Sequence, residues 1–174
     1  GWRHLYFIYP CFLFMSLYGF YLIKNIFIKK KLLINFFCLL FVIQISFWMY
    51  SNHPFQNVYF NIFAGKKFDK YFEMDYWGNS NKAALEYILN NENQKIDVYN
   101  LNTSDLLLSK KILESSKRNQ INITYDINNS DYIINSFRDW NGVTKPQDYK
   151  IPPDFKLIYE IKVDDVVINT IYKK

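Results

Sequence analysis

Two long apolar runs near the beginning of the sequence constrain the fold of this chain more than any other feature. Residues 5–23 (LYFIYPCFLFMSLYGFYLI) contain no Asp, Glu, Lys, Arg or His, and residues 32–50 (LLINFFCLLFVIQISFWMY) have Asn35 and Gln44 as their most polar members. As a helix, each run is about long enough to cross a hydrocarbon core roughly 30 Å thick. The sequence therefore predicts two transmembrane helices.

The segment between the two runs predicts their orientation. Residues 24–31 (KNIFIKKK) contain four lysines in eight residues, and short lysine-rich loops stay on the cytoplasmic side. Both outer ends, and everything after Ser51, are then expected outside a cytoplasmic (inner) membrane that the chain crosses more than once. A signal peptide is the alternative for the first run, but Arg3 and His4 make a thin basic region, and no small-residue cleavage site follows before the lysines.

The charges divide at the same place. Residues 1–51 contain no Asp or Glu and five of the 21 Lys and Arg, so the other 16 Lys and Arg balance all 16 Asp and Glu of the later part. The net charge of +5 belongs to the first part, and the second part is neutral. A neutral domain argues against nucleic acid as a partner, because binding to phosphates needs an excess of basic side chains.

After the second run, we expect residues 52–79 to form an interfacial connector and residues 80–174 to form a small extracytoplasmic α/β domain with a mixed sheet. The first helix of this domain is predicted to start with Ser80 as its cap and to end near Asn91. Its apolar face is expected at Ala84, Tyr87 and Ile88.

A second helix is predicted from a cap at Thr103 or Ser104 to about Arg118. Its apolar residues are Leu107, Leu108 and Ile112. Strands are predicted at residues 96–101, 121–125 and 132–135, and a closing hairpin at residues 155–163 and 166–172 around Asp164 and Asp165. The expected fold class is thus a membrane α-helical part with two transmembrane helices, followed by a small α/β domain.

The first candidate binding residues are Arg3 and His4, which come directly before the first predicted span. One interpretation is an anchor whose Arg side chain reaches the headgroup region. The other is a site for a lipid phosphate, because the guanidinium group donates two hydrogen bonds to such a group.

A second group of candidates lies in the connector motif HPFQNVYFN, at His53, Gln56, Tyr59 and Asn61. A hydrogen-bonded strap between helix and domain is the favoured interpretation, and contact with a substrate is the other. A metal site is not expected, because His53 has no second ligand at suitable spacing. Neither a GxGxxG nor a P-loop motif is present, so no nucleotide cofactor is expected.

A third group follows in YFEMDYWGNS, at Glu73, Asp75, Tyr76 and Trp77. Two carboxylates can act as acid and base on a glycosidic bond when they face each other across it. Here they are two residues apart, and in extended backbone both would point the same way. A cap or an ion pair is therefore the favoured role of these carboxylates, and the two aromatic rings could stack on a sugar or enter the membrane surface.

Several of these motifs together resemble a known family. WRHLYFIYP, the lysine-rich turn, HPFQNVYFN and FEMDYWGNS resemble the C-terminal end of bacterial membrane glycosyltransferases of the GT-C fold, similar to glycosyltransferase family 39, the dolichyl-phosphate-mannose–protein mannosyltransferase type. The resemblance covers about residues 1–80 by motif. Beyond them it rests on the order of elements and on the closing hairpin.

The resemblance implies transfer of a sugar from a polyprenyl-phosphate donor on the outer face of the membrane. In that family the catalytic carboxylate lies in an early outer loop, which is not found in this sequence, so the chain would be inactive alone and would act with the remaining transmembrane bundle of a longer protein. Arg3 and His4 would bind the lipid phosphate, and residues 73–77 would cover the site. A first residue that is Gly rather than Met agrees with this expectation.

The alternative is a non-enzymatic anchor of two spans that presents an extracytoplasmic binding or scaffolding domain. The gene upstream of Gly1 would separate the two. Many further hydrophobic spans, with an acidic residue in the first outer loop, would favour the enzyme, and a start codon just upstream would favour the anchor.

Overall fold

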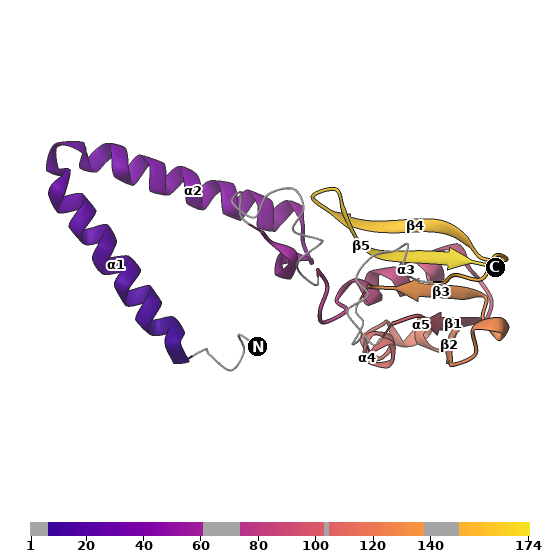
Figure 1. Ribbon diagram of the computed structural model, residues 1–174. Helices are drawn as coiled ribbons and strands as arrows, with labels where there is room; N and C mark the ends of the chain where they lie inside the picture. The colour runs from indigo at the N-terminus through magenta and orange to yellow at the C-terminus, as the bar shows by residue number, and fades with distance from the viewer. Residues whose placement is uncertain (1–6, 61–73, 103–104, 138–149) are drawn as a thin grey trace. The chain divides into compact units, whose positions relative to one another are not determined.

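The computed structural model describes residues 7–60, 74–102, 105–137 and 150–174 (Figure 1). The chain divides into two compact units, Gly1–Ser51 and Asn52–Lys174. The first is helical and the second contains the sheet.

The first unit consists of two helices joined by a very short turn. Helix α1 runs over Tyr9–Ile26 and helix α2 over Lys31–Ser51, with a 3₁₀ turn at Ile28–Lys30 between them. Both predicted apolar runs are therefore helical over the residues that the structure describes. Pro10 lies in the first turn of α1, where a missing backbone N–H leaves no intrahelical bond unmade.

The lysine-rich turn is shorter than predicted, because the helices take residues from both of its ends. Lys24 belongs to the last turn of α1, and Lys31 opens α2. Helical backbone bonds continue as long as no residue prevents them, and residues 24–26 contain neither Pro nor Gly. The change from apolar to basic residues therefore does not mark the ends of these two helices.

One helix among the described residues is long and apolar enough to cross a membrane, judged by length and composition. It is the stretch Ile28–Ser51, 24 residues long, which is about 36 Å at the rise of an α-helix. Helix α1 does not meet this criterion of length and composition. Its 18 residues have a lower mean hydropathy because they include Pro10, Lys24, Asn25 and three tyrosines. The expectation of two spans is thus met in part, by one candidate.

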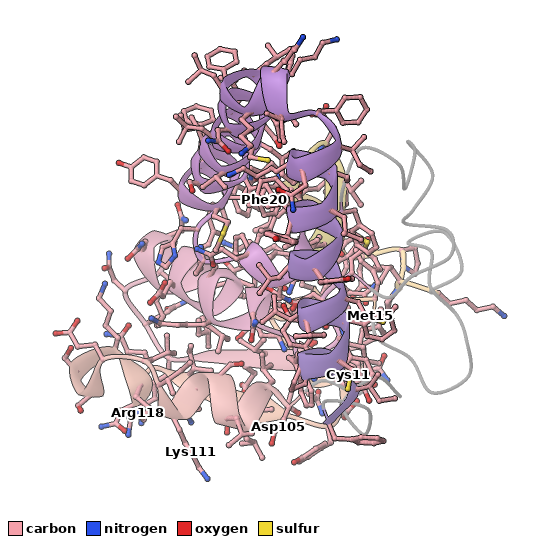
Figure 2. The ribbon with its side chains drawn as sticks, turned by 90° about the vertical axis from the view of Figure 1, so that its left-hand side faces the viewer. Cys11, Met15, Phe20, Asp105, Lys111 and Arg118 are labelled. Carbon is pink, nitrogen blue, oxygen red and sulfur yellow. The ribbon has the colours of Figure 1, made fainter. Side chains whose placement is uncertain are left out.

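Neither α1 nor α2 buries a single residue within its unit. Their Phe, Leu, Ile and Tyr side chains point outward on all sides. Figure 2 labels Cys11, Met15 and Phe20 along α1. A soluble helix presents one apolar stripe to a core, whereas these helices are apolar all round.

The second unit begins with a connector and a helix. A 3₁₀ turn at Gln56–Val58 lies in the connector, and helix α3 covers Ser80–Asn91 as predicted. Ala84 and Ile88 are buried as expected, together with Leu85 and Leu89, and Tyr87 is half-buried. The predicted cap is wrong, because Ser80 is the first helical residue and its backbone N–H is bound by another side chain, described below.

The predicted second helix is two short helices. Helix α4 covers Leu106–Lys111 and helix α5 covers Ser115–Arg118. The cap is Asp105, whose carboxylate accepts from the Leu108 N–H at 3.1 Å. Thr103 and Ser104, the expected caps, lie outside the described residues.

The apolar residues named for this helix are not the ones that the structure buries. Leu107, Leu108 and Ile112 are 47%, 57% and 64% exposed, whereas Leu106 and Leu113 are buried. Three successive leucines point to different sides of a helix, so their order does not indicate which of them is buried. The break between α4 and α5 decides which of them packs inward.

The sheet has five strands in the order β2-β1-β3-β5-β4. They are β1 (Ile96–Asn100), β2 (Ile121–Thr124), β3 (Tyr132–Asn135), β4 (Lys156–Val163) and β5 (Val166–Lys173). Strand β1 runs parallel to β2 and to β3, while β5 runs antiparallel to β3 and to β4. The predicted mixed sheet is confirmed, and so is the hairpin.

The hairpin turn is made by two aspartates. Asp164 and Asp165 have φ of 49° and 66°. A two-residue turn with both central residues at positive φ matches the right-handed twist of the flanking strands, and Asp tolerates this conformation better than most residues. The sequence VDDV therefore sets the register of β4 and β5.

The core lies between the sheet and α3 and α4. Paired residues of neighbouring strands point to the same face, which places Val98, Ile134 and Ile171 together. The helix face of the sheet is the one that carries Asn169, which is hydrogen-bonded to α3. All four residues of β3 are buried, as expected for the third of five strands.

Candidate functional site

Several predicted site residues lie outside the described part of the chain. They are Arg3, His4, Asn61 and Glu73. Their roles stay predictions.

The connector motif folds into a small hydrogen-bonded turn. Gln56 Nε2 and His53 Nδ1 are 2.7 Å apart, and the Val58 N–H donates to the Phe55 carbonyl at 3.0 Å. Val58 is buried, and the side chains of His53 and Gln56 are hydrogen-bonded to each other. Tyr59 follows at the end of the turn. These contacts favour a structural strap, and within the described residues no group of three His, Cys, Asp or Glu could hold a metal ion.

Asp75 is a structural residue in this fold. Its side chain is only 2% exposed. One carboxylate oxygen accepts from the Asn79 N–H at 2.9 Å, and the other accepts from the N–H and the hydroxyl of Ser80 at 2.8 and 2.5 Å. It therefore binds the free N–H groups at the start of α3, where a negative charge is favoured by the helix dipole.

The capping interaction continues to the C-terminal hairpin. Asn169 of β5 donates its Nδ2 to Ser80 Oγ at 2.8 Å and to Asn81 Oδ1 at 3.0 Å. All four side chains of this network, Asp75 included, are at most 2% exposed. Because the carboxylate is committed to three donors, it does not face an open site as an acid or a base.

Tyr76 and Trp77 occupy the turn between Asp75 and the helix. The Gly78 N–H donates to the Asp75 carbonyl at 2.9 Å, and Gly78 has a φ of 67°. The two rings meet edge to face with centroids 5.0 Å apart, and Trp77 is 61% exposed. The turn thus presents an aromatic pair at the surface while Asp75 points inward.

A cluster of ionisable groups joins the end of α3 to the sheet. Tyr132 Oη and Lys173 Nζ both donate to Glu92 Oε1, at 2.5 and 2.6 Å. The hydrogen bond from Lys173, with that from Tyr132, lowers the pKa of Glu92 below its ordinary value. Burial, followed by the bond to Glu92, raises the pKa of Tyr132, and the bond to Glu92 raises that of Lys173.

This cluster is at the amino end of the parallel strands, because Tyr132 opens β3. Ligands of open α/β sheets bind at the opposite edge, outside the carboxyl ends of the strands. We therefore interpret the cluster as a clamp between α3, β3 and β5.

A crevice of about 250 Å³ lies at the carboxyl edge, where β1 and β2 end and α4 begins. Six of the described residues that line it are polar, namely Tyr99, Asn100, Asn102, Asp105, Thr124 and Tyr125. Leu106, Leu107 and Ile123 complete the lining. Strand ends supply one wall, and the start of α4 supplies another.

The polar walls of the crevice are held by local bonds. Asp105 Oδ1 caps α4, as described, and Thr124 Oγ1 accepts from the Asp126 N–H at 3.1 Å. Tyr125 is 84% exposed at the rim. Figure 2 shows Asp105 at one end of this helix and Lys111 at the other, where the Lys111 side chain extends away from the domain.

The crevice is connected to the point at which strand order reverses. Strands β2 and β3 flank β1 on opposite sides, and ligands of doubly wound sheets bind at such a switch point. Asn102 Nδ2 donates to Asn135 Oδ1, at the end of β3, over 3.3 Å. Asn135 is fully buried, and its Nδ2 has no hydrogen-bond partner within the described part of the chain.

The sequence alone did not indicate this crevice. Its residues come from three separate segments, at positions 99–102, 105–107 and 123–125, and only the parallel pairing of β1 with β2 brings them together. A usable signal was present in the pattern: each predicted strand ends in polar residues or is followed by one, in YNLN, TYD and NS.

Comparisons with protein-family models, with curated proteins and with solved structures gave no match to this chain. The resemblance to membrane glycosyltransferases therefore stays an expectation from sequence motifs. The function has to be argued from the residues themselves.

Asp75→Ala is expected to lower the free energy of unfolding of the α/β unit by about 2–4 kcal/mol, because it removes a buried cap and leaves N–H groups at the start of α3 unpaired. Chemical denaturation followed by circular dichroism measures the change. Asp154→Ala is the control, because this half-exposed carboxylate makes only a 3.7 Å ion pair with Lys174. Equal effects of the two substitutions would contradict the capping role.

Glu92→Gln is expected to destabilise the unit in a pH-dependent manner. The folded-state pKa of Glu92 is below its ordinary value of 4.5, so the ionised carboxylate contributes stability above about pH 4.5 and loses it as the pH falls through the lowered pKa. The variant should therefore be less stable than the parent at pH 7, and the difference should shrink in acid. Denaturant midpoints across this pH range give the answer, with Glu86→Gln on the same helix as the control. A constant difference at all pH values would refute the clamp.

Proposed function

We propose that this chain is a two-span membrane protein that holds its α/β unit on the outer side of a cytoplasmic membrane, and that this unit is a binding domain. The observation that carries the proposal is the surface of the first unit. Two consecutive helices of 18 and 21 residues expose apolar side chains on every side and bury none. Such a surface is stable in hydrocarbon and unfavourable in water.

The ends of the helices support the same placement. Trp48 and Tyr50 lie near the end of α2, and Tyr9 opens α1, where interfacial aromatic rings are common. Lys24 and the three lysines of residues 29–31 lie at the other end of both helices. By the positive-inside rule the lysines stay in the cytoplasm and the α/β unit is outside.

The arrangement of the α/β unit favours binding over catalysis. The buried carboxylate of the described residues, Asp75, is committed to capping α3, and the Glu92 cluster is a clamp between elements. A feature with the shape of a site is the crevice of about 250 Å³ at the carboxyl edge. Asp105 is the single carboxylate among the described residues that line it, and these residues therefore offer no facing pair for acid and base catalysis.

A second candidate function is the C-terminal part of a membrane glycosyltransferase that uses a polyprenyl-phosphate sugar. It is favoured by the motif resemblance and by the uncovered faces of α1 and α2, which could pack against further helices. In this case Arg3 and His4 hold the lipid phosphate, and the outer domain covers the site.

Cysteine labelling of the full chain tests the first proposal. In a parent with Cys11 and Cys38 replaced by serine, single cysteines are placed at Ser116 on α5, at Asn25 beside the lysines, and at Gly1. An impermeant maleimide added to intact spheroplasts should label Ser116→Cys and Gly1→Cys but not Asn25→Cys, which should react only after the membrane is broken.

Each position decides a different part of the proposal. Ser116 is exposed on a helix surface, and Asn25→Cys leaves all four lysines in place. Labelling of Asn25→Cys but not Ser116→Cys in intact spheroplasts would refute the orientation. A protected Gly1→Cys would show that α1 does not cross the membrane.

The second candidate predicts an effect of Arg3→Ala on sugar transfer. In the full-length protein the turnover should fall and the KM for the lipid-linked sugar should rise, because a charge that holds the phosphate is lost. Arg118→Ala, in the outer domain, is the control. Unchanged transfer in Arg3→Ala would remove the role of this residue in binding the phosphate.

A further inference from the structure

We infer that the crevice at the carboxyl edge of β1 and β2 binds a neutral, hydroxyl-rich ligand of the sugar class. The inference rests on the proposed function, since it names the ligand of the proposed binding domain. It is argued from the lining chemistry, from the size of the crevice and from its place in the fold.

The charge of the lining excludes an anionic ligand. Among the described residues that line the crevice there is no lysine or arginine, and the one charged residue is Asp105. A phosphate or carboxylate would meet a like charge with no cation to pair it. Neutral hydroxyl groups instead donate well to a carboxylate, and such hydrogen bonds are stronger than those between neutral groups.

The other polar groups suit a ligand that both donates and accepts. Asn100 and Asn102 each carry an amide with two donor hydrogens and an acceptor oxygen, and Thr124 adds a hydroxyl. A sugar ring presents neighbouring hydroxyl groups that also do both. A ligand with hydroxyl groups can pair with both kinds of group, whereas an apolar ligand can pair with neither.

Size and aromatic rings point the same way. The volume of about 250 Å³ is below the roughly 300–1,000 Å³ of pockets for drug-sized ligands, so a small ligand fits. Tyr99 and Tyr125 offer ring faces, and Tyr125 is 84% exposed at the rim. A tyrosine ring can pack against the C–H face of a sugar while its hydroxyl group stays in water.

The buried amide of Asn135 supports the wall of the crevice to which Asn102 belongs. Its Oδ1 accepts from Asn102 Nδ2 and from the Phe137 N–H, at 3.3 and 2.9 Å. Asn135 itself is not among the described residues that line the crevice. It therefore positions the Asn102 amide, which does line it.

Ligand binding is measured by saturation-transfer difference NMR on the full chain in detergent. The probes are the methyl glycosides of glucose, galactose, mannose and N-acetylglucosamine, with glucose 6-phosphate as the anionic comparison. At least one neutral sugar should bind, and glucose 6-phosphate should bind more weakly than methyl glucoside.

Two variants locate the bound sugar. Tyr125→Ala should weaken binding by about fivefold, as expected for loss of one aromatic contact. Asp105→Asn should also weaken it, and because Asn caps helices as well as Asp does, α4 should be kept. Tyr159→Ala is the matched control, since this 42% exposed tyrosine lies on β4 at the other edge of the sheet.

A third variant reverses the selectivity. Leu107→Lys places a cation at the exposed wall of the crevice and should favour glucose 6-phosphate over methyl glucoside. Binding of none of the neutral sugars would overturn the inference, and so would binding that Tyr125→Ala and Asp105→Asn leave unchanged. Membrane orientation does not enter a measurement in detergent, so this failure is distinct from failure of the labelling experiment.

Discussion

The α/β unit depends on one buried carboxylate. Asp75 binds the start of α3, and through Ser80 it is connected to Asn169 on β5, 89 residues further along the chain. The network therefore fixes the helix against a sheet whose last strands come from the end of the sequence. A charge in the interior is tolerated only when donors surround it, and here the donors are the N–H groups that a helix start leaves unpaired. Asp75 thus pairs the N–H groups at the start of α3 and also fixes the position of this helix over the sheet.

The two units obey different physical rules. In the second, apolar side chains are gathered between the sheet and its helices, and the buried side chains of Asp75, Ser80, Asn81 and Asn169 are paired in one network. In the first, the apolar side chains of α1 and α2 face outward and nothing is packed between them. In the proposed membrane placement, lipid supplies the missing contacts for these helices. The change from one kind of unit to the other occurs near Ser51, and all acidic residues of the chain come after this point.

Much of the α/β fold could be predicted from the sequence, because local signals determine it. The VDDV turn, the β-branched runs of the strands and the polar caps gave the hairpin, β1 to β3 and the bounds of α3. The buried face of α4 could not be predicted, since three leucines in succession do not indicate which side of the helix packs against the sheet. The role of Asp75 was within reach as a cap, but its partner Asn169 is distant in sequence. The crevice could not be predicted, because it forms only when the parallel strands β1 and β2 pair, and local sequence patterns do not specify this pairing.

The order of the strands has a consequence for how the domain is made. Strand β5, the last in sequence, lies inside the sheet between β3 and β4 rather than at an edge. It supplies the backbone bonds for β3 and, through Asn169, the contact that holds α3. During synthesis the earlier strands therefore leave an open sheet edge until residue 173 has emerged from the ribosome. The sheet of the α/β unit is therefore completed only after β5 has emerged, and until then the backbone groups of β3 on that side have no strand to pair with.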